Sequence, residues 1–267
     1  WIHPVPRQYN HPLRIRIREQ LKGSQNNINS IVLSNQKMEE KPTIPLELTI
    51  EDMPFVAVVG LHRSGSSCTA GLLHKLGVHM GDKLVGYEKT GGYEGVGLVR
   101  ICEAAYPFPS TRLRMERGKL LSALAKHIKY VQRSASKKGK IAGGKYPHLC
   151  AMGDELFEIC QDKLRVIHIN RPLEESIQSL ISRVKRSRRH RRKLSAKDLE
   201  ATQRWLWGCK LEFLSRVDHL TVEYHNLIED PRREANRIIE YLELDPDSVS
   251  YSKAVAHVQP GLRKHFV

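Results

Sequence analysis

Apolar and polar positions first settle into a regular pattern at Pro54. Phe55–Val59 is an unbroken apolar run between a proline and a glycine, which is typical of a strand that is buried on both faces. After a turn rich in glycine and serine, leucines recur at helical spacing over 68–76, and Gly77 follows them. Glycine is favoured just beyond the last turn of a helix. This segment therefore predicts a strand, a glycine-rich turn and a helix, in that order.

The same alternation continues to the C-terminus. We predict further strands at 164–169 and 219–224, and further helices at 115–131, after Pro172, at 199–214 and after Asp230-Pro231. Residues 81–97 and 134–144 are rich in glycine or in small and basic residues, so we expect loops there. Strands that alternate with helices predict an α/β fold, in which helices flank a central parallel sheet.

Composition and charge limit the class of protein. Residues 1–53 mix prolines and polar stretches with short apolar pieces, so we expect a partly irregular leader before one domain at 54–267. Lys and Arg total 44 against 29 for Asp and Glu, a net charge of +15, which favours anionic partners. No apolar run approaches the ~20 residues that cross a bilayer. The five cysteines show no zinc-ligand spacing, and we expect free thiols, no bound metal and a cytoplasmic protein, although a chain that starts at Trp1 leaves an upstream signal or anchor open.

The turn after the first strand has the spacing of a phosphate-binding loop. Gly60 and Gly65 stand as the two glycines of the Walker A pattern do, at the start of a helix. Backbone N–H groups in such a turn surround a phosphate, and the helix N-terminus adds partial positive charge. Ser66 occupies the position of the Walker lysine, and the cation within the loop is Arg63. The fold is thus predicted to be a P-loop nucleotide-binding fold that lacks the usual lysine for a nucleoside triphosphate.

With these residues the loop resembles the 5′-phosphosulfate loop of sulfotransferases that use 3′-phosphoadenosine 5′-phosphosulfate (PAPS), especially the tyrosylprotein type and its bacterial and phage relatives. Arg171 follows the strand at 164–169, and Ser179 comes eight positions later, which is similar to the clamp of this family for the 3′-phosphate. The resemblance implies transfer of a sulfuryl group from PAPS to a hydroxyl or amine acceptor, without a metal. The implied PAPS-binding residues are Gly60, His62, Arg63, Ser64, Gly65, Ser66, Ser67, Arg171 and Ser179. A softer likeness, at 224–231, implies only a structural role.

The reacting centre needs a base for the acceptor proton and cations for the charge that develops on the leaving oxygen. Arg63 and Lys145 are the candidate cations. Lys145 lies in a segment that looks like the Lys-Asp-Pro element of the family, with Tyr146 in place of the acid. Glu94, in a glycine-rich segment, is the first candidate for the base, and His148 is the rival because cytosolic members use a histidine. We expect His62 to orient the loop.

Other functions remain open at this point. The basic run at 183–193 carries much of the excess charge and has no aromatic residue for base stacking. We therefore expect no specific nucleic acid, and an acidic acceptor such as a polysaccharide or an acidic peptide. A P-loop kinase or NTPase is one alternative, and magnesium-dependent ATP turnover would favour it. A non-catalytic nucleotide- or polyanion-binding protein is another, and it would be indifferent to loss of Glu94 or Lys145.

Overall fold

The structure is a computed structural model that describes residues 53–85, 92–186, 194–245 and 250–258. Nearly all of the predicted leader, residues 1–52, and residues 187–193 of the basic run lie outside these ranges. Within the described ranges, no helix combines the length and the apolar character that a membrane span requires.

A parallel sheet of five strands forms the centre of the fold, in the order β2-β5-β1-β6-β7. The strands are β1 (Phe55–Val59), β2 (Val78–His79), β5 (Ile141–Lys145), β6 (Leu164–Asn170) and β7 (His219–Glu223). A separate antiparallel pair joins β3 (Leu84–Val85) to β4 (Glu94–Gly95). Strand β1 pairs in parallel with β5 on one side and β6 on the other. The predicted α/β fold with a central parallel sheet is confirmed.

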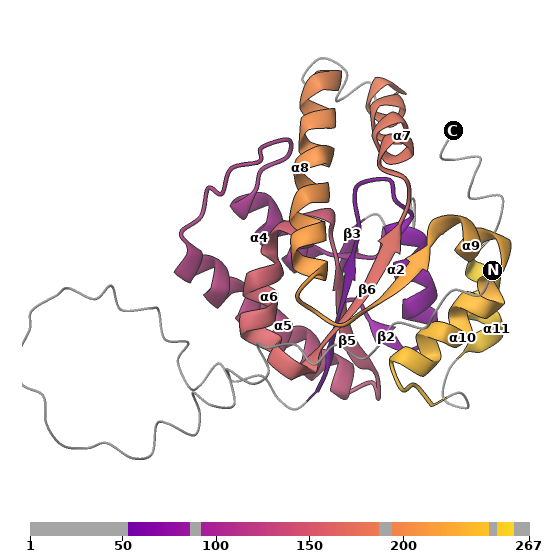
Figure 1. The fold of residues 1–267 in the computed structure, drawn as a ribbon. Helices are drawn as coiled ribbons and strands as arrows, with labels where there is room; N and C mark the ends of the chain where they lie inside the picture. Colours follow the sequence, from indigo (N-terminus) through magenta and orange to yellow (C-terminus); the bar gives the residue numbers. More distant parts are fainter. Residues whose placement is uncertain (1–52, 86–91, 187–193, 246–249, 259–267) are drawn as a thin grey trace, which may run out of the picture. The chain divides into compact units, whose positions relative to one another are not determined.

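Helices cover both faces of the sheet (Figure 1). Side chains on β1 alternate between two apolar clusters, with Phe55, Ala57 and Val59 in one and Val56 and Val58 in the other, as the two-residue period of a strand requires. The first face carries α4 (Val96–Ala105), α5 (Arg117–Ser136), η3 (Pro147–Met152), α6 (Gly153–Cys160) and α8 (Ala196–Leu214). The second face carries α2 (Ser66–Lys75), α9 (Tyr224–Glu229), α10 (Pro231–Tyr241) and α11 (Tyr251–His257). Helix α7 (Leu173–Arg186) lies beside α8 (Figure 1), and η4 (Gln161–Lys163) precedes β6.

Two predicted loops are wrong. The end of the stretch at 134–144 belongs to β5, an inner strand of the sheet, and the end of the stretch at 81–97 belongs to β4 and the first turn of α4. Strand β5 has no apolar run because its neighbours leave no room for one. A Cβ on Gly143 would lie 2.6 Å from the Val78 side chain, and a Cβ on Gly144 would lie 2.9 Å from Leu98. Close packing therefore selects small residues here and removes the hydrophobic pattern that marks a buried strand.

Asp82 fastens the segment after β2 to helix α5. Its carboxylate accepts hydrogen bonds from Lys138 Nζ (2.5 Å), Ser134 Oγ (2.7 Å) and the Tyr130 hydroxyl (2.9 Å). These bonds, with that from Lys138 the strongest, hold the pKa of Asp82 far below its usual range. A carboxyl group whose pKa is lowered on folding stabilises the native state above its unfolded pKa of about 3.9, and that contribution is lost as the pH falls below it.

We therefore expect Asp82→Asn to lower the free energy of unfolding by about 1 kcal/mol at pH 7. The gap to the wild type should narrow as the pH falls from about 5 to about 3, because the wild-type carboxylate loses its advantage there. Urea unfolding at both ends of this range measures it. His79 is coupled to this carboxylate, because its Nε2 lies 3.3 Å from Asp82 Oδ1, so the comparison is made with His79→Gln in both proteins. The other histidines are common to both and cancel in the difference. A gap that stays constant with pH would contradict the assignment.

Candidate functional site

The turn between β1 and α2 folds as a tight phosphate-type loop. Arg63 and Gly65 have positive φ angles of 66° and 98°, and the Ser64 hydroxyl donates to the carbonyl of Leu61 at 2.9 Å. Gly60 lies so close to this hydroxyl that an added Cβ would be 2.7 Å from Ser64 Oγ. The two glycines at the predicted spacing are therefore required by the backbone, one by its φ angle and one by a close approach. The N-terminus of α2 begins at Ser66 and opens onto the loop.

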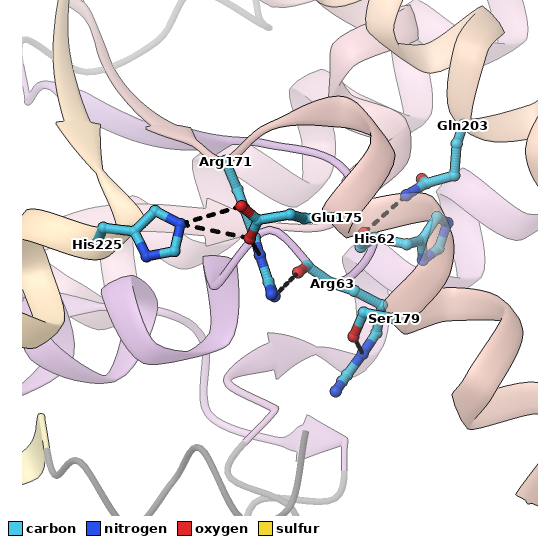
Figure 2. A network of polar contacts seen from close by, with 7 residues as sticks. All are labelled: His62, Arg63, Arg171, Glu175, Ser179, Gln203 and His225. Carbon is cyan, nitrogen blue, oxygen red and sulfur yellow. Dashed lines mark hydrogen bonds and ion pairs between the residues drawn. The ribbon is translucent and has the colours of Figure 1, made fainter. Parts of the chain in front are cut away.

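The second predicted anion site lies beside the first. Arg171 follows the C-terminal end of β6, which pairs with β1, so both segments leave the same edge of the sheet. Arg171 Nη1 donates to the carbonyl of Arg63 at 3.0 Å, and Arg63 Nε donates to Ser179 Oγ at 3.4 Å. Figure 2 shows Arg63 between Arg171 and Ser179. One pocket is lined by Arg63, Gly65, Ser66, Ser67, Cys68, Arg171, Tyr224 and Ile228.

On the other side of the loop, Lys145 and Glu94 form an ion pair. Lys145 ends β5, and its Nζ lies 2.6 Å from Glu94 Oε1 and 3.0 Å from Ser67 Oγ. The Lys145 side chain is only 2% exposed, and this burial lowers its pKa although Glu94 opposes the shift. Because β5, β1 and β6 are adjacent in the sheet, Lys145, the loop and Arg171 follow one another along its carboxyl edge. Ligands of parallel α/β sheets bind at this edge.

His62 and His148 lie in a cluster of rings next to the loop. Their ring centroids are 5.5 Å apart, and the ring of His148 also lies near those of Tyr146, Tyr106 and Trp205. Burial lowers the pKa of His62 to about 3 and that of His148 to about 4, so both rings are neutral at pH 7. His148 is fully buried, and neither of its ring nitrogens has a hydrogen-bond partner among the described residues. Of the two candidate bases, Glu94 is thus the one paired with Lys145, which in turn contacts Ser67 of the loop.

Tyr146 stands where the resembled family has an acidic residue, and the structure supplies an acid from elsewhere. The Tyr146 hydroxyl donates to Glu103 of α4, whose other carboxylate oxygen accepts from the backbone N–H of Phe108 at 3.3 Å. The residue after Lys145 is thus still tied to a carboxylate, which comes from a helix distant in the sequence.

Several residues that the sequence did not single out belong to the site. Tyr224 and Ile228 of α9 form an apolar part of the pocket wall, where only a structural role was predicted for this segment. Glu175 contacts Arg171, and Gln203 of α8 donates to the carbonyl of His62 at 2.8 Å. One signal was available for Tyr224, since it follows the end of β7 and side chains at the carboxyl ends of neighbouring parallel strands meet. In the described ranges, no group of three or more His, Cys, Asp or Glu side chains could hold a metal ion.

The loop and Tyr224 depend on each other at Gly65, which yields a testable expectation. A Cβ at this position would lie only 2.3 Å from Cδ2 of the Tyr224 ring, and a φ of 98° is itself unfavourable for alanine. We expect Gly65→Ala to lower the free energy of unfolding by about 2–4 kcal/mol, from backbone strain plus the clash. Urea unfolding measures this loss.

Gly77→Ala is the matched control, because Gly77 has a φ of 102° but none of the residues that the structure describes comes within 4 Å of an added Cβ. It should lose only about 1–2 kcal/mol, the strain of the left-handed backbone. Equal losses in the two variants would show that Tyr224 does not pack against Gly65.

Comparison with known proteins gives likenesses of structure only. No protein-family model matches the chain, and no curated protein matches it. Among solved structures, a sulfotransferase domain from the curacin biosynthetic pathway aligns with a TM-score of 0.47 and 13% identity, over 80% of this chain and 87% of that one. The sulfotransferase STF9 from Mycobacterium avium aligns with a TM-score of 0.49 and 11% identity, over 78% of this chain and 67% of that one. Since one fold hosts many activities, the function has to come from the site.

Proposed function

We propose that the chain is a sulfotransferase that moves a sulfuryl group from PAPS to a hydroxyl or amine acceptor and releases adenosine 3′,5′-bisphosphate. One geometric observation supports this most strongly. The phosphate-type loop and Arg171 border the same pocket, although Arg171 comes 111 residues after Gly60, where the loop begins. Ser179 is hydrogen-bonded to Arg63 of that loop. Two anion sites around one pocket match a nucleotide that carries anionic groups at both ends of one adenosine.

The residues around the pocket fit such a nucleotide in kind. Backbone N–H groups at the start of α2, with Ser66 and Ser67, suit the 5′-phosphate. Arg171 offers a planar fork of donors to the 3′-phosphate, and Tyr224 provides an apolar wall for the adenosine. Burial, followed by the nearby charges of Arg183 and Arg171, lowers the pKa of Arg63 to about 10. An anion in the pocket would relieve this crowding of positive charge.

PAPS supplies an activated sulfuryl group, and the protein has to position the acceptor and stabilise charge. In this proposal Glu94 accepts the proton of the acceptor hydroxyl. Lys145, held 3.0 Å from Ser67 of the loop, neutralises the oxygen that remains on the 5′-phosphate as the sulfuryl group leaves. A buried ammonium ion in a site of low dielectric is worth more in this role than it would be in water.

The acceptor in this proposal is anionic. Arg183, Lys185 and Arg186 at the end of α7 are exposed, and they continue in the sequence into the rest of the basic run. A positive field near the pocket concentrates acidic molecules, such as a polysaccharide or an acidic peptide, and its effect falls with ionic strength.

The experiment that tests the function compares ligands by calorimetry. Adenosine 3′,5′-bisphosphate should bind more tightly than ADP, with or without Mg²⁺, and labelled PAPS should then transfer its sulfuryl group in a screen of acceptors. Preference for ADP together with magnesium-dependent ATP turnover would instead support a kinase or NTPase. Tight binding of the bisphosphate, with no transfer to any acceptor and no change on loss of Glu94 or Lys145, would support a non-catalytic binding protein.

A further inference from the structure

The guanidinium group of Arg171 is held on three sides by the protein. Its Nε donates to Glu175 Oε2 at 3.0 Å, and its Nη1 donates to the carbonyl of Arg63 at 3.0 Å. Its Cζ lies 4.8 Å from the centre of the Tyr224 ring. A guanidinium has five N–H groups. These contacts use two, and the other three have no partner among the described residues, on a side chain that borders the pocket.

Glu175 is itself fixed from a second element. It lies four residues after Arg171, within the first turn of α7, and His225 of α9 places its Nε2 3.3 Å from Glu175 Oε1 and Oε2. Figure 2 shows the Glu175 carboxylate between Arg171 and His225. The hydrogen bond from Arg171 lowers the pKa of Glu175, which keeps it a carboxylate at neutral pH. The Arg171 orientation is therefore determined by two helices and by the loop.

We propose that Glu175 is a positioning residue, which holds Arg171 so that its remaining N–H groups are ready for the 3′-phosphate of the nucleotide. This inference rests on the proposed function. A free arginine side chain loses rotamer freedom when it binds a phosphate, and a side chain that is already fixed loses much less. Glu175 thus strengthens phosphate binding, although its own charge repels the phosphate.

These two effects have opposite signs, so substitution separates them. Glu175→Ala removes both the hydrogen bond to Arg171 and the negative charge, whereas Glu175→Gln removes the charge but keeps an oxygen that accepts from Arg171 Nε. If Glu175 acts by holding Arg171, which we call a brace, alanine weakens binding of the phosphate and glutamine does not. If it acts only as a charge, both variants bind the phosphate more tightly than the wild type.

The matched control is Glu174→Ala. Glu174 is the neighbouring residue, carries the same charge and pairs instead with Arg204 at 2.9 Å. It therefore reports the effect of removing one negative charge, and one residue of the same type, from the first turn of α7.

The experiment measures the dissociation constants of adenosine 3′,5′-bisphosphate and of adenosine 5′-phosphate by calorimetry, with thermal unfolding to confirm that each variant is folded. Glu175→Ala should bind the bisphosphate about three- to tenfold more weakly and the monophosphate as the wild type does. Glu175→Gln should stay within about twofold of the wild type for both ligands, and Glu174→Ala should not weaken either. In an Arg171→Ala background, where there is no guanidinium left to position, Glu175→Ala should not weaken bisphosphate binding any further.

Bisphosphate binding by Glu175→Ala that equals or exceeds that of the wild type would overturn the proposal, and so would an equal loss for both ligands. If the wild type does not prefer the bisphosphate to the monophosphate, the 3′-phosphate site and the proposed function fail together with it. If the wild type clearly prefers the bisphosphate to the monophosphate and Glu175→Ala keeps that preference, the positioning role of Glu175 is refuted and the proposed function is not.

Discussion

Glu94→Gln is expected to slow sulfuryl transfer by about 10²- to 10⁴-fold, the usual contribution of a general base. Glutamine keeps the shape of the side chain and an oxygen for the bond from Lys145 Nζ, but it cannot take a proton. Glu94 is not among the residues that line the pocket beside Arg171, so the dissociation constant of adenosine 3′,5′-bisphosphate should change little. Single-turnover rates with labelled PAPS, measured beside calorimetric binding, separate the two effects.

The same measurements on a variant of His148, the other candidate base, give the opposite expectation. His148→Gln removes a ring that is fully buried and makes no hydrogen bond within the part of the chain that the structure describes, so it should lower the melting temperature more than the rate constant. Surface variant Glu116→Gln, at a carboxylate whose ion-pair partner is the exposed Lys119, controls for the loss of one charge. If the rate collapses in His148→Gln and persists in Glu94→Gln, the base has been assigned to the wrong residue.

The apolar strands were predictable because their signal is local. Phe55–Val59 was predicted with its observed bounds, and the strand predicted at 164–169 extends by one residue to Asn170. In both, the buried apolar side chains stand close together in the sequence, all five residues in the first strand and Leu164, Val166, Ile167 and Ile169 in the second. Strand β5 carries no such signal, since Gly143 and Gly144 are selected by the side chains that pack above and below them.

The residues of the site also fall into those with a local sequence signal and those without one. The loop was predictable because one turn of backbone sets the spacing of Gly60 and Gly65. The partner of Lys145 was not, because Glu94 reaches it from a strand 51 residues away, and its approach depends on how β4 lies against β5. Glu175 and Tyr224 belong to the same class, since each matters only through its contact with Arg171. Roles that arise from contacts between distant segments need the fold before they can be assigned.

Lys145→Met is expected to reduce the rate constant of transfer by about 10²- to 10³-fold, which is typical for loss of one group that stabilises developing charge. Methionine fills the space of the buried stem but carries no charge. Loss of the ammonium ion also leaves the Glu94 carboxylate, only 23% exposed, without its partner, so the variant should unfold at a lower temperature. Lys145 is not part of the pocket lining, so affinity for adenosine 3′,5′-bisphosphate should fall much less than the rate.

A second buried lysine provides the matched control. Lys210 of α8 is 2% exposed, and burial lowers its pKa as it does that of Lys145, but it contacts neither Glu94 nor the loop in any hydrogen bond of the described residues. Lys210→Met should therefore change stability and leave the rate within a few-fold of the wild type. Because Lys145 and Glu94 are bonded to each other, Lys145→Met combined with Glu94→Gln should lose less than the product of the two single effects. If the loss of rate in the double variant equals the product of the two single losses, the two residues act independently, and the ion pair has no role in the reaction.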